Sequence, residues 1–162
     1  MQIETTRLII DDLKSSDKNE YFINISNNEK VLETFICNYE KDIDSFNFEK
    51  YLNRDDIFAM RMKASKKLIG IIVLLPINKE KKSIEIGYCI GSDYWNNGYT
   101  SEATKTFIDY IFDHNLASTI YASHFKENIA SQKVMIKCGM SYSHTNVNEL
   151  VYLGKPRDLI YY

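Results

Sequence analysis

Apolar residues occupy every second position from Ile84 to Ile90, which is the period of a β-strand with two distinct faces. A stretch rich in small and polar residues, 91–98, follows the strand and ends at Gly98. From Ala103 to His114 the apolar and aromatic positions recur at helical spacing, so a helix is expected to begin just after Gly98. The chain therefore runs from a strand through a short loop into a helix whose first N–H groups have no partner within the helix.

This strand–loop–helix unit predicts an anion site. The first N–H groups of a helix, with the helix dipole behind them, attract negatively charged groups. We expect the backbone N–H groups of Asn97, Gly98, Tyr99, Thr100 and Ser101 to hold the pyrophosphate of a cofactor. Gly98 would allow the ligand to approach the backbone closely. The alternative interpretation is an ordinary helix start with no ligand.

The segments before this unit predict strands and short helices. Three short helical stretches carry apolar residues around Tyr21, Val31 and Phe48, and Ser16 or Asp17 is expected to cap the first of them. Strands separated by polar turns at 63–67 and 76–82 are expected over 7–13, 57–62 and 68–75. The last two of these strands and the strand at 84–90 follow one another on short connections, which predicts an antiparallel meander.

The segments after the helix complete the expected architecture. The pattern predicts another strand over 119–125, which would form a βαβ crossover with parallel pairing. Asn128 is expected to cap a helix that runs to Cys138, with Gly139 as a left-handed residue just beyond its end. Strands at 150–153 and 157–161 would form a closing hairpin. Because no repeat or linker divides the chain, we expect one domain over residues 1–162, of α+β class, with a mixed sheet and helices on both faces.

Composition narrows the class of protein. With 162 residues, of which 44% are apolar and 26% charged, the chain can bury a core and has the balance of a soluble globular protein. A net charge of −2 with mixed signs argues against nucleic acid as the main ligand. Cys37, Cys89 and Cys138 lack metal-binding spacing, which fits reduced thiols and no metal site. Without a secretory signal pattern or a membrane-spanning apolar run, we expect a cytoplasmic protein that does not bind membranes.

Two blocks of sequence carry a resemblance to a known family. Residues 85–103, EIGYCIGSDYWNNGYTSEA, resemble the acyl-CoA-binding motif of the GNAT N-acetyltransferase superfamily, and more narrowly of its RimJ/RimL-like branch. Residues 127–140, ENIASQKVMIKCGM, resemble the second conserved block of that branch, and weaker matches lie at 6–10 and 157–161. The resemblance implies the GNAT fold, acetyl-CoA as co-substrate and a primary amine as acceptor. The acceptor would be the N-terminus of a ribosomal or other protein, or a small molecule, and the enzyme a monomer or homodimer.

The loop departs from the family pattern at three positions. Asn96 replaces a usual Gly, Asn97 a usual basic residue, and Thr100 a usual Ala or Gly. The positive charge missing at Asn97 would weaken the attraction for phosphate. Lysines that can restore this charge are Lys126, Lys133 and Lys137.

Acetyl transfer from a thioester to an amine requires a base, a donor for the carbonyl oxygen and a donor for the leaving thiolate. Glu85, on the strand before the loop, is the expected base, and the alternative is a carboxylate on a solvated strand face. A backbone N–H near Cys89 or Ile90 is expected to stabilise the oxyanion. The resemblance assigns thiolate protonation to Ser131, because Met135 replaces the tyrosine that related enzymes use. The alternative role for Ser131 is to let the cofactor pack against the helix.

Further candidate residues lie in or near the two blocks, and two other functions are possible. The resemblance implies that Asn128, besides capping its helix, contacts the pantetheine arm of the cofactor. Cys89 is disfavoured as a nucleophile, and His124 and Tyr142 are secondary proton donors. A sensor or scaffold that binds acyl-CoA without turnover is an alternative, because the loop is substituted and Met135 carries no proton. A nucleotide-binding protein is disfavoured, because the loop lacks GxGxxG and Walker spacing.

Overall fold

The computed structural model describes residues 2–78, 80 and 82–162. The strands of its central sheet lie side by side in the order in which they occur in the sequence. Within these residues the sheet has the order β1 (Gln2–Glu4), β2 (Leu8–Asp12), β3 (Ile57–Met62), β4 (Leu68–Asn78), β5 (Ser83–Ile90) and β6 (Thr119–Tyr121). Neighbouring strands are antiparallel except β5 and β6, which are parallel and joined through helix α3 (Tyr99–Asp113). The predicted meander and the βαβ crossover are confirmed.

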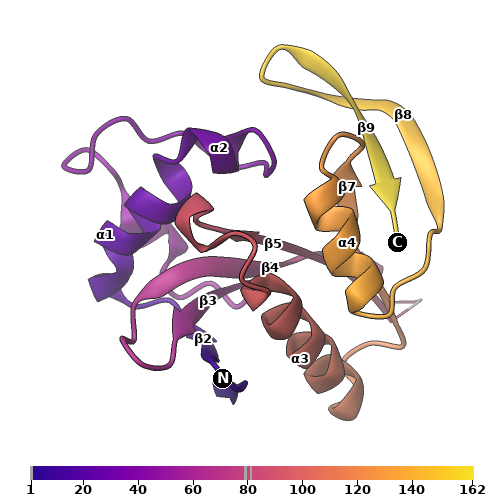
Figure 1. The fold of residues 1–162 in the computed structure, drawn as a ribbon, viewed down its shortest axis with the longest axis horizontal. Coiled ribbons are helices and arrows are strands. Elements are labelled where there is room, and N and C mark those ends of the chain that lie inside the picture. Colours follow the sequence, from indigo (N-terminus) through magenta and orange to yellow (C-terminus); the bar gives the residue numbers. More distant parts are fainter. Residues whose placement is uncertain (1, 79, 81) are drawn as a thin grey trace.

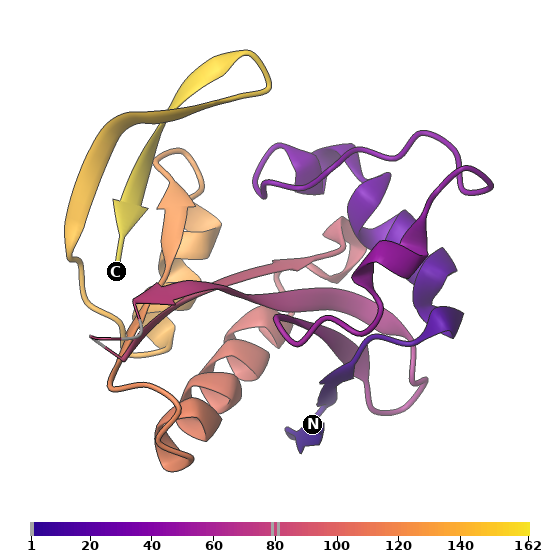
Figure 2. The same cartoon turned by 180° about the vertical axis from the view of Figure 1, so that it is seen from behind.

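A second sheet contains the strands that follow. Its order is β7 (Ser123–Phe125), β9 (Lys155–Tyr161) and β8 (His144–Tyr152). The prediction of one continuous strand over 119–125 is therefore wrong. The buried Ala122 leaves β5 and exchanges two backbone hydrogen bonds with Tyr162, at 3.1 and 2.9 Å, so the chain changes partners there. Figures 1 and 2 show the hairpin of β8 and β9 standing away from the central sheet.

The closing hairpin is longer than its apolar pattern indicates. β8 begins at His144 rather than at Leu150, and β9 begins at Lys155. The side chains from 144 to 149 are all exposed, so this part of the strand lacks the alternation of apolar and polar residues that reveals a half-buried strand.

Helices cover both faces of the central sheet, which confirms the α+β class (Figure 1). On one face, α3 and α4 (Ile129–Lys137) pack Phe107, Ile111 and Met135 against Ile84 and Ile86 of β5. Each of these side chains is nearly fully buried, and such burial stabilises the fold by about 1.5–3 kcal/mol per side chain. Among the described residues, no helix is both long and apolar enough to cross a bilayer.

The other face is covered by short helical segments over an aromatic cluster. α1 (Lys18–Tyr21) continues into a π-helical turn at Phe22–Ser26, and α2 (Glu29–Leu32) follows. The cluster beneath them consists of Tyr21, Phe46, Phe48 and Tyr51, with ring centroids 4.9–6.1 Å apart. The third predicted helix is a 3₁₀ turn at Phe48–Tyr51, and another such turn, Ser15–Asp17, precedes α1. β4 extends to Asn78, so the predicted turn at 76–82 begins later than expected. Two positions of that turn, Lys79 and Lys81, lie outside the described residues.

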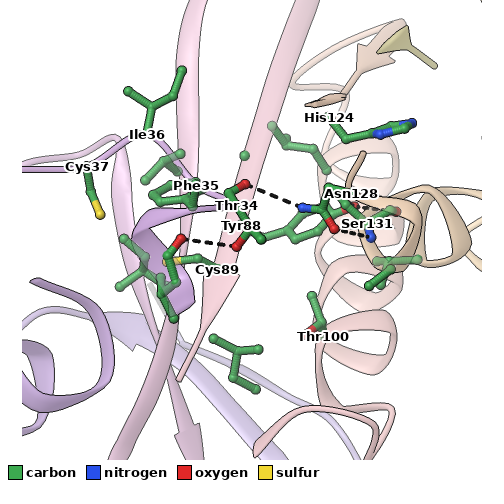
Figure 3. Close-up of a pocket in the computed structure, with 18 of the residues that line it drawn as sticks. Thr34, Phe35, Ile36, Cys37, Tyr88, Cys89, Thr100, His124, Asn128 and Ser131 are labelled. Carbon is green, nitrogen blue, oxygen red and sulfur yellow. Dashed lines mark hydrogen bonds between the residues drawn. The ribbon is translucent and has the colours of Figure 1, made fainter. Parts of the chain in front are cut away.

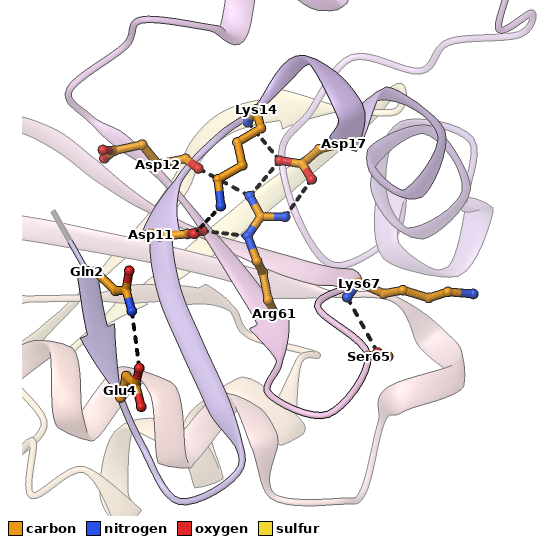
Figure 4. A network of polar contacts seen from close by, with 9 residues as sticks. All are labelled: Gln2, Glu4, Asp11, Asp12, Lys14, Asp17, Arg61, Ser65 and Lys67. Carbon is orange, nitrogen blue, oxygen red and sulfur yellow. Dashed lines mark hydrogen bonds and ion pairs between the residues drawn. The ribbon is translucent and has the colours of Figure 1, made fainter.

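A buried ion network ties β2, β3 and the start of α1 together (Figure 4). Arg61 of β3 is 4% exposed and donates hydrogen bonds to Asp11 and to both carboxylate oxygens of Asp17. Lys14 adds an ion pair to Asp11 at 2.6 Å and donates its backbone N–H to Asp17 at 2.8 Å. Asp17 occupies the predicted N-cap position of α1, but its carboxylate makes no cap hydrogen bond to that helix and pairs with Arg61 instead.

Candidate functional site

A cavity of about 960 Å³ lies where the two sheets diverge (Figure 3). It is lined by β5, β7, α4 and residues 34–38 after α2, which we call the strap. β6 pairs with β5 only over Ser83–Glu85, so the part of β5 from Ile86 to Ile90 lines the cavity without a neighbouring strand on that side. An open strand edge offers backbone donors and acceptors, which suit an extended ligand that carries amide groups.

The start of α3 forms one end of this cavity. Gly98 has φ = +78°, and a Cβ there would meet only Arg7 Nη2, at 3.6 Å. The first backbone hydrogen bond of the helix runs from Glu102 N–H to Gly98 O at 3.0 Å, so the N–H groups of Tyr99, Thr100 and Ser101 precede the helical ladder. Gly98 and these three residues line the cavity, where the predicted anion site requires them.

Asn97 occupies a different position. Its side-chain amide donates to the carbonyls of Tyr94 and Trp95 at 3.2 and 2.9 Å, which closes the loop onto itself. Asn97 is not among the residues that line the cavity. Contact between its backbone N–H and a phosphate stays a prediction.

Arg7 is a basic residue at the loop that the sequence analysis did not assign to the site. Its guanidinium lies 4.4 Å from the centroid of the Tyr99 ring and donates to the carbonyl of Asn97 at 3.0 Å. It also forms a 2.7 Å ion pair with Glu102 in the first turn of α3. Arg7 lies in the segment 6–10 that weakly resembles the family, and this resemblance was the signal that could have indicated it. The order of the strands alone does not bring residue 7 next to residue 98. Of the three lysines proposed to restore positive charge, Lys133 and Lys137 line the cavity, whereas Lys126 pairs with Asp158 at 3.5 Å.

Glu85 lies on β5 at the point where β6 ends, half-buried, and lines the cavity. Its Oε1 accepts a hydrogen bond from Ser123 Oγ of β7 at 2.9 Å. Burial, a hydrogen bond to Glu149 and the charge of Glu85 together raise the pKa of Tyr161 on β9. The hydrogen bond from Ser123 orients one carboxylate oxygen of Glu85. The carboxylate retains lone pairs that can accept a proton from an amine or a water molecule.

Asn128 caps α4 as predicted, because its Oδ1 accepts from the N–H of Ser131 at 3.1 Å. Its Nδ2 donates across the cavity to the carbonyl of Thr34, at 3.4 Å (Figure 3). Tyr152 of β8 donates to the carbonyl of the next residue, Phe35, at 3.0 Å. The strap is therefore fastened across the cavity from α4 on one side and from the hairpin on the other.

Tyr88 is a second residue that the sequence analysis did not include, because its place in the β5 alternation indicated packing only. Its hydroxyl lies 3.1 Å from Ser131 Oγ and 3.2 Å from the carbonyl oxygen of Ser131. Both residues line the cavity, from β5 and from α4. Met135 is 1% exposed in the core beneath α4, and it does not line the cavity. Hydroxyl groups therefore reach the cavity from positions 88 and 131 rather than from position 135.

The two thiols that line the cavity are held in the protonated state. Burial, with a smaller effect of Cys37, raises the pKa of Cys89 well above its usual value. Burial also raises the pKa of Cys37, to about 11. Both thiols are therefore protonated at neutral pH and are poor nucleophiles. The buried His124 donates from Nδ1 to the carbonyl of Phe125 at 2.8 Å, and Tyr142 is 61% exposed on the surface.

The cavity residues fit a long ligand with a phosphate end and an amide-rich arm. The helix start, Lys133 and Lys137 supply positive potential, and the β5 edge supplies backbone hydrogen-bonding groups. Glu85 supplies a carboxylate, and hydroxyls come from Tyr88 and Ser131. No group of three His, Cys, Asp or Glu residues in the described part of the chain is arranged to hold a metal ion.

Known proteins share both the sequence pattern and the fold. Residues 7–141 match the family described as the acetyltransferase (GNAT) domain. The uncharacterized N-acetyltransferase YoaA of Bacillus subtilis is 27% identical over 162 residues, covering 96% of this chain and 92% of YoaA. YnaD of the same organism, also named as an N-acetyltransferase, is 30% identical over 142 residues, or 86% of this chain and 82% of YnaD. The crystal structure of a GNAT-family acetyltransferase from Bacillus anthracis superposes with a TM-score of 0.83 at 25% identity, over 99% of this chain and 96% of that one.

These matches cover most of the chain, and the family match at 7–141 includes both sequence blocks. The predicted GNAT fold is confirmed. The chain belongs to the GNAT family of N-acetyltransferases.

Proposed function

We propose that this enzyme transfers the acetyl group of acetyl-CoA to a primary amine by direct attack in a ternary complex. The observation that carries the proposal is one cavity that extends from the start of α3, past the open edge of β5, to the carboxylate of Glu85. Donor and acceptor held together in one cavity react without the entropic cost of a second encounter. The protonated thiols of Cys37 and Cys89 argue for direct attack rather than an acetylated enzyme.

The donor half of the cavity binds the coenzyme. The N–H groups from Gly98 to Ser101, with that of Asn97 at the edge of the loop, hold the pyrophosphate. Lys133 and Lys137, which line the cavity with Gly98–Ser101, add positive potential. The pantetheine arm lies along β5 and contacts Asn128, whose Nδ2 exchanges the Thr34 carbonyl for a ligand acceptor. A backbone N–H at Cys89 or Ile90 stabilises the carbonyl oxygen as it gains negative charge.

The acceptor half provides the base. Glu85, oriented by Ser123, takes a proton from the amine, directly or through a water molecule, so that the nitrogen attacks with a free lone pair. Ser131 supplies a hydrogen bond to the departing sulfur from the opposite wall of the cavity.

The acceptor is a protein N-terminus or a small-molecule amine, as in the RimJ/RimL-like branch. Solved structures with this fold include a ribosomal-protein-S5-alanine acetyltransferase from Vibrio fischeri, with 21% identity and a TM-score of 0.77. They also include a spermidine N-acetyltransferase from Vibrio cholerae, with 21% identity and a TM-score of 0.80, so the fold alone does not select the acceptor. The strap favours the small amine here, because an extended peptide would need to displace the hydrogen bond that Tyr152 makes to the carbonyl of Phe35.

The compartment we infer is the cytoplasm, because Cys37, Cys89 and Cys138 are all free thiols in this fold.

The experiment that tests the function combines binding and turnover. Isothermal titration calorimetry with coenzyme A is expected to show one site per chain. Acetyl transfer is then measured with a panel of small amines and of peptides with free N-termini. Gly98→Val is the negative control, because a branched side chain at this positive φ would disturb the helix start and should abolish coenzyme binding.

The alternative function is a sensor or scaffold that binds acyl-CoA without turnover. Two observations favour it: Asn97 brings no charge to the loop, and Met135 brings no hydroxyl to the cavity. Coenzyme binding without transfer to any amine of the panel would support this alternative. Absence of coenzyme binding in the wild-type protein would refute both.

A further inference from the structure

We propose that Tyr88 and Ser131 work as a coupled hydroxyl pair in which Tyr88 orients Ser131 to donate a hydrogen bond to the sulfur that leaves the acetyl group. The inference rests on the proposed acetyl transfer. It adds Tyr88 as a positioning residue for that reaction.

The two hydroxyls meet across the cavity at the level of the reacting group. Tyr88 is the neighbour of Cys89 on β5, and Ser131 faces it from the first turn of α4 (Figure 3). One strand residue spans about 3.4 Å, so a thioester carbonyl bound at Cys89 or Ile90 places its sulfur within reach of this pair. No other pair of side-chain hydroxyls in the described part of the cavity wall is hydrogen-bonded across from β5 to α4.

The contacts leave one hydroxyl proton free to turn toward the cavity. The Tyr88 hydroxyl has one proton and two acceptors nearby, the carbonyl oxygen of Ser131 at 3.2 Å and Ser131 Oγ at 3.1 Å. When Tyr88 donates to the carbonyl, Ser131 can donate to the Tyr88 oxygen. When Tyr88 donates to Ser131 Oγ instead, the Ser131 proton is released to point at the sulfur. A small rotation of two hydroxyls thus presents a donor at the moment that the sulfur becomes negative.

The backbone of α4 keeps Ser131 in place for this role. Its N–H donates to Asn128 Oδ1 at 3.1 Å, so the first turn of α4 is held by the cap. Burial raises the pKa of Tyr88, so the phenol remains neutral and acts as a donor without ionising.

The reaction balances without a proton lost from the pair. The amine nitrogen forms a bond to the thioester carbon, the carbon–sulfur bond breaks, and its electron pair moves to the sulfur. The amine proton passes to Glu85 or to water. Tyr88 and Ser131 keep their protons and stabilise the thiolate by hydrogen bonding, and the thiolate is protonated by solvent after release.

The test compares Tyr88→Phe, Ser131→Ala and the double variant in acetyl transfer to the best amine of the panel. We expect Tyr88→Phe to lower kcat about 10-fold and Ser131→Ala about 100-fold, with little change in KM for acetyl-CoA, as for loss of a transition-state donor. The double variant should be no slower than Ser131→Ala alone, because Tyr88 acts through Ser131. Tyr110→Phe, which removes a phenol on α3 outside the cavity, is the matched control and should retain the wild-type rate.

A change of leaving group separates this role from a structural one. The selenoester analogue of acetyl-CoA releases a less basic selenolate, which needs less stabilisation. We expect the defect of Tyr88→Phe to shrink with the selenoester, whereas a packing defect would be the same with both donors.

The outcomes distinguish this inference from the function on which it rests. Wild-type transfer with an unchanged Tyr88→Phe rate, an additive double variant, or equal defects with both donors would each overturn the coupled pair alone. A wild-type protein that binds no coenzyme A, or transfers to no amine, would overturn the proposed function and the pair together.

Discussion

Replacing Gly70 with alanine should impair catalysis, although Gly70 lies on the strand next to the cavity-lining strand β5. Gly70 on β4 pairs directly with Ile90 on β5. A Cβ at this position would lie 2.4 Å from the carbonyl oxygen of Cys89, 2.9 Å from Ile90 Cα and 2.6 Å from Met60 Cε. The Met60 methyl can rotate away, but the two backbone atoms can move only if β5 moves. These backbone atoms belong to the segment that we propose for oxyanion stabilisation.

The size of the effect follows from these distances. Carbon–oxygen contacts shorter than about 3.4 Å are repulsive, so β5 must shift by about 1 Å at Cys89. Overpacking of this kind destabilises a protein by about 1–3 kcal/mol. A displacement of about 1 Å at the reacting group lowers the rate by about 100-fold. We therefore expect Gly70→Ala to be folded, moderately less stable, and strongly reduced in kcat.

The assay combines urea unfolding with initial rates at saturating acceptor and varied acetyl-CoA. Gly139→Ala is the matched control, because Gly139 has φ = +85° and a Cβ added there would meet no atom within 4 Å. That substitution costs about 1–2 kcal/mol of backbone strain and leaves the cavity unchanged. A wild-type kcat in Gly70→Ala, or the same loss of activity in both variants at equal loss of stability, would show that no displacement of β5 impairs catalysis.

Four further predictions address the base, the loop, the buried network and the histidine. Glu85→Gln should lower kcat about 100-fold while calorimetry finds unchanged coenzyme A affinity; an unaltered rate over the whole pH range would remove Glu85 from the mechanism. Arg7→Gln should raise KM for acetyl-CoA several-fold, with Arg7→Lys intermediate, because the guanidinium holds the loop through Asn97 and Tyr99; equal KM values in steady-state kinetics would contradict this. Arg61→Met should lower the free energy of unfolding in urea by about 3–5 kcal/mol, because the buried Asp17 loses its ion-pair partner and Asp11 keeps only the exposed Lys14; a loss below about 1 kcal/mol would show that the remaining contacts of Lys14 compensate both carboxylates. Burial lowers the pKa of His124, so the unfolded chain binds a proton that the folded chain does not, and stability should fall as the pH drops below about 6.5. His124→Phe should flatten that part of the curve of urea midpoint against pH, and an unchanged slope would assign the pH dependence to other groups.

The sequence determined the elements whose evidence is local. The alternation at Ile84–Ile90, the helix after Gly98 and the cap at Asn128 each depend on side chains within a few residues of one another. The structure confirms all three, because the apolar period and the cap are set by residues close together in the chain, although β5 itself pairs with the distant strand β6. The two sequence blocks also identified the family, since they carry the residues around the helix start.

Tertiary structure alone decided where the chain changes partners. Nothing in the sequence of 119–125 marks a break in the predicted strand, yet Ala122 pairs with Tyr162 rather than with β5. That pairing depends on a residue forty positions later, which no local pattern reports. The early part of β8 was not predicted for a related reason: its side chains are all exposed, and its pairing with β9 depends on residues more than ten positions later.

The residues of the candidate site also fall into two groups. Sequence motifs indicate Glu85, Ser131 and the N–H groups after Gly98, whereas only the structure brings in Arg7 and Tyr88. Arg7 reaches the loop only because β2 and α3 pack side by side, and Tyr88 differs from a packing residue only because Ser131 faces it across the cavity. A sequence pattern shows which secondary-structure element a residue belongs to and which face of that element it occupies. A hydroxyl or a guanidinium gains its role from contacts between distant segments, and these contacts form only in the folded chain.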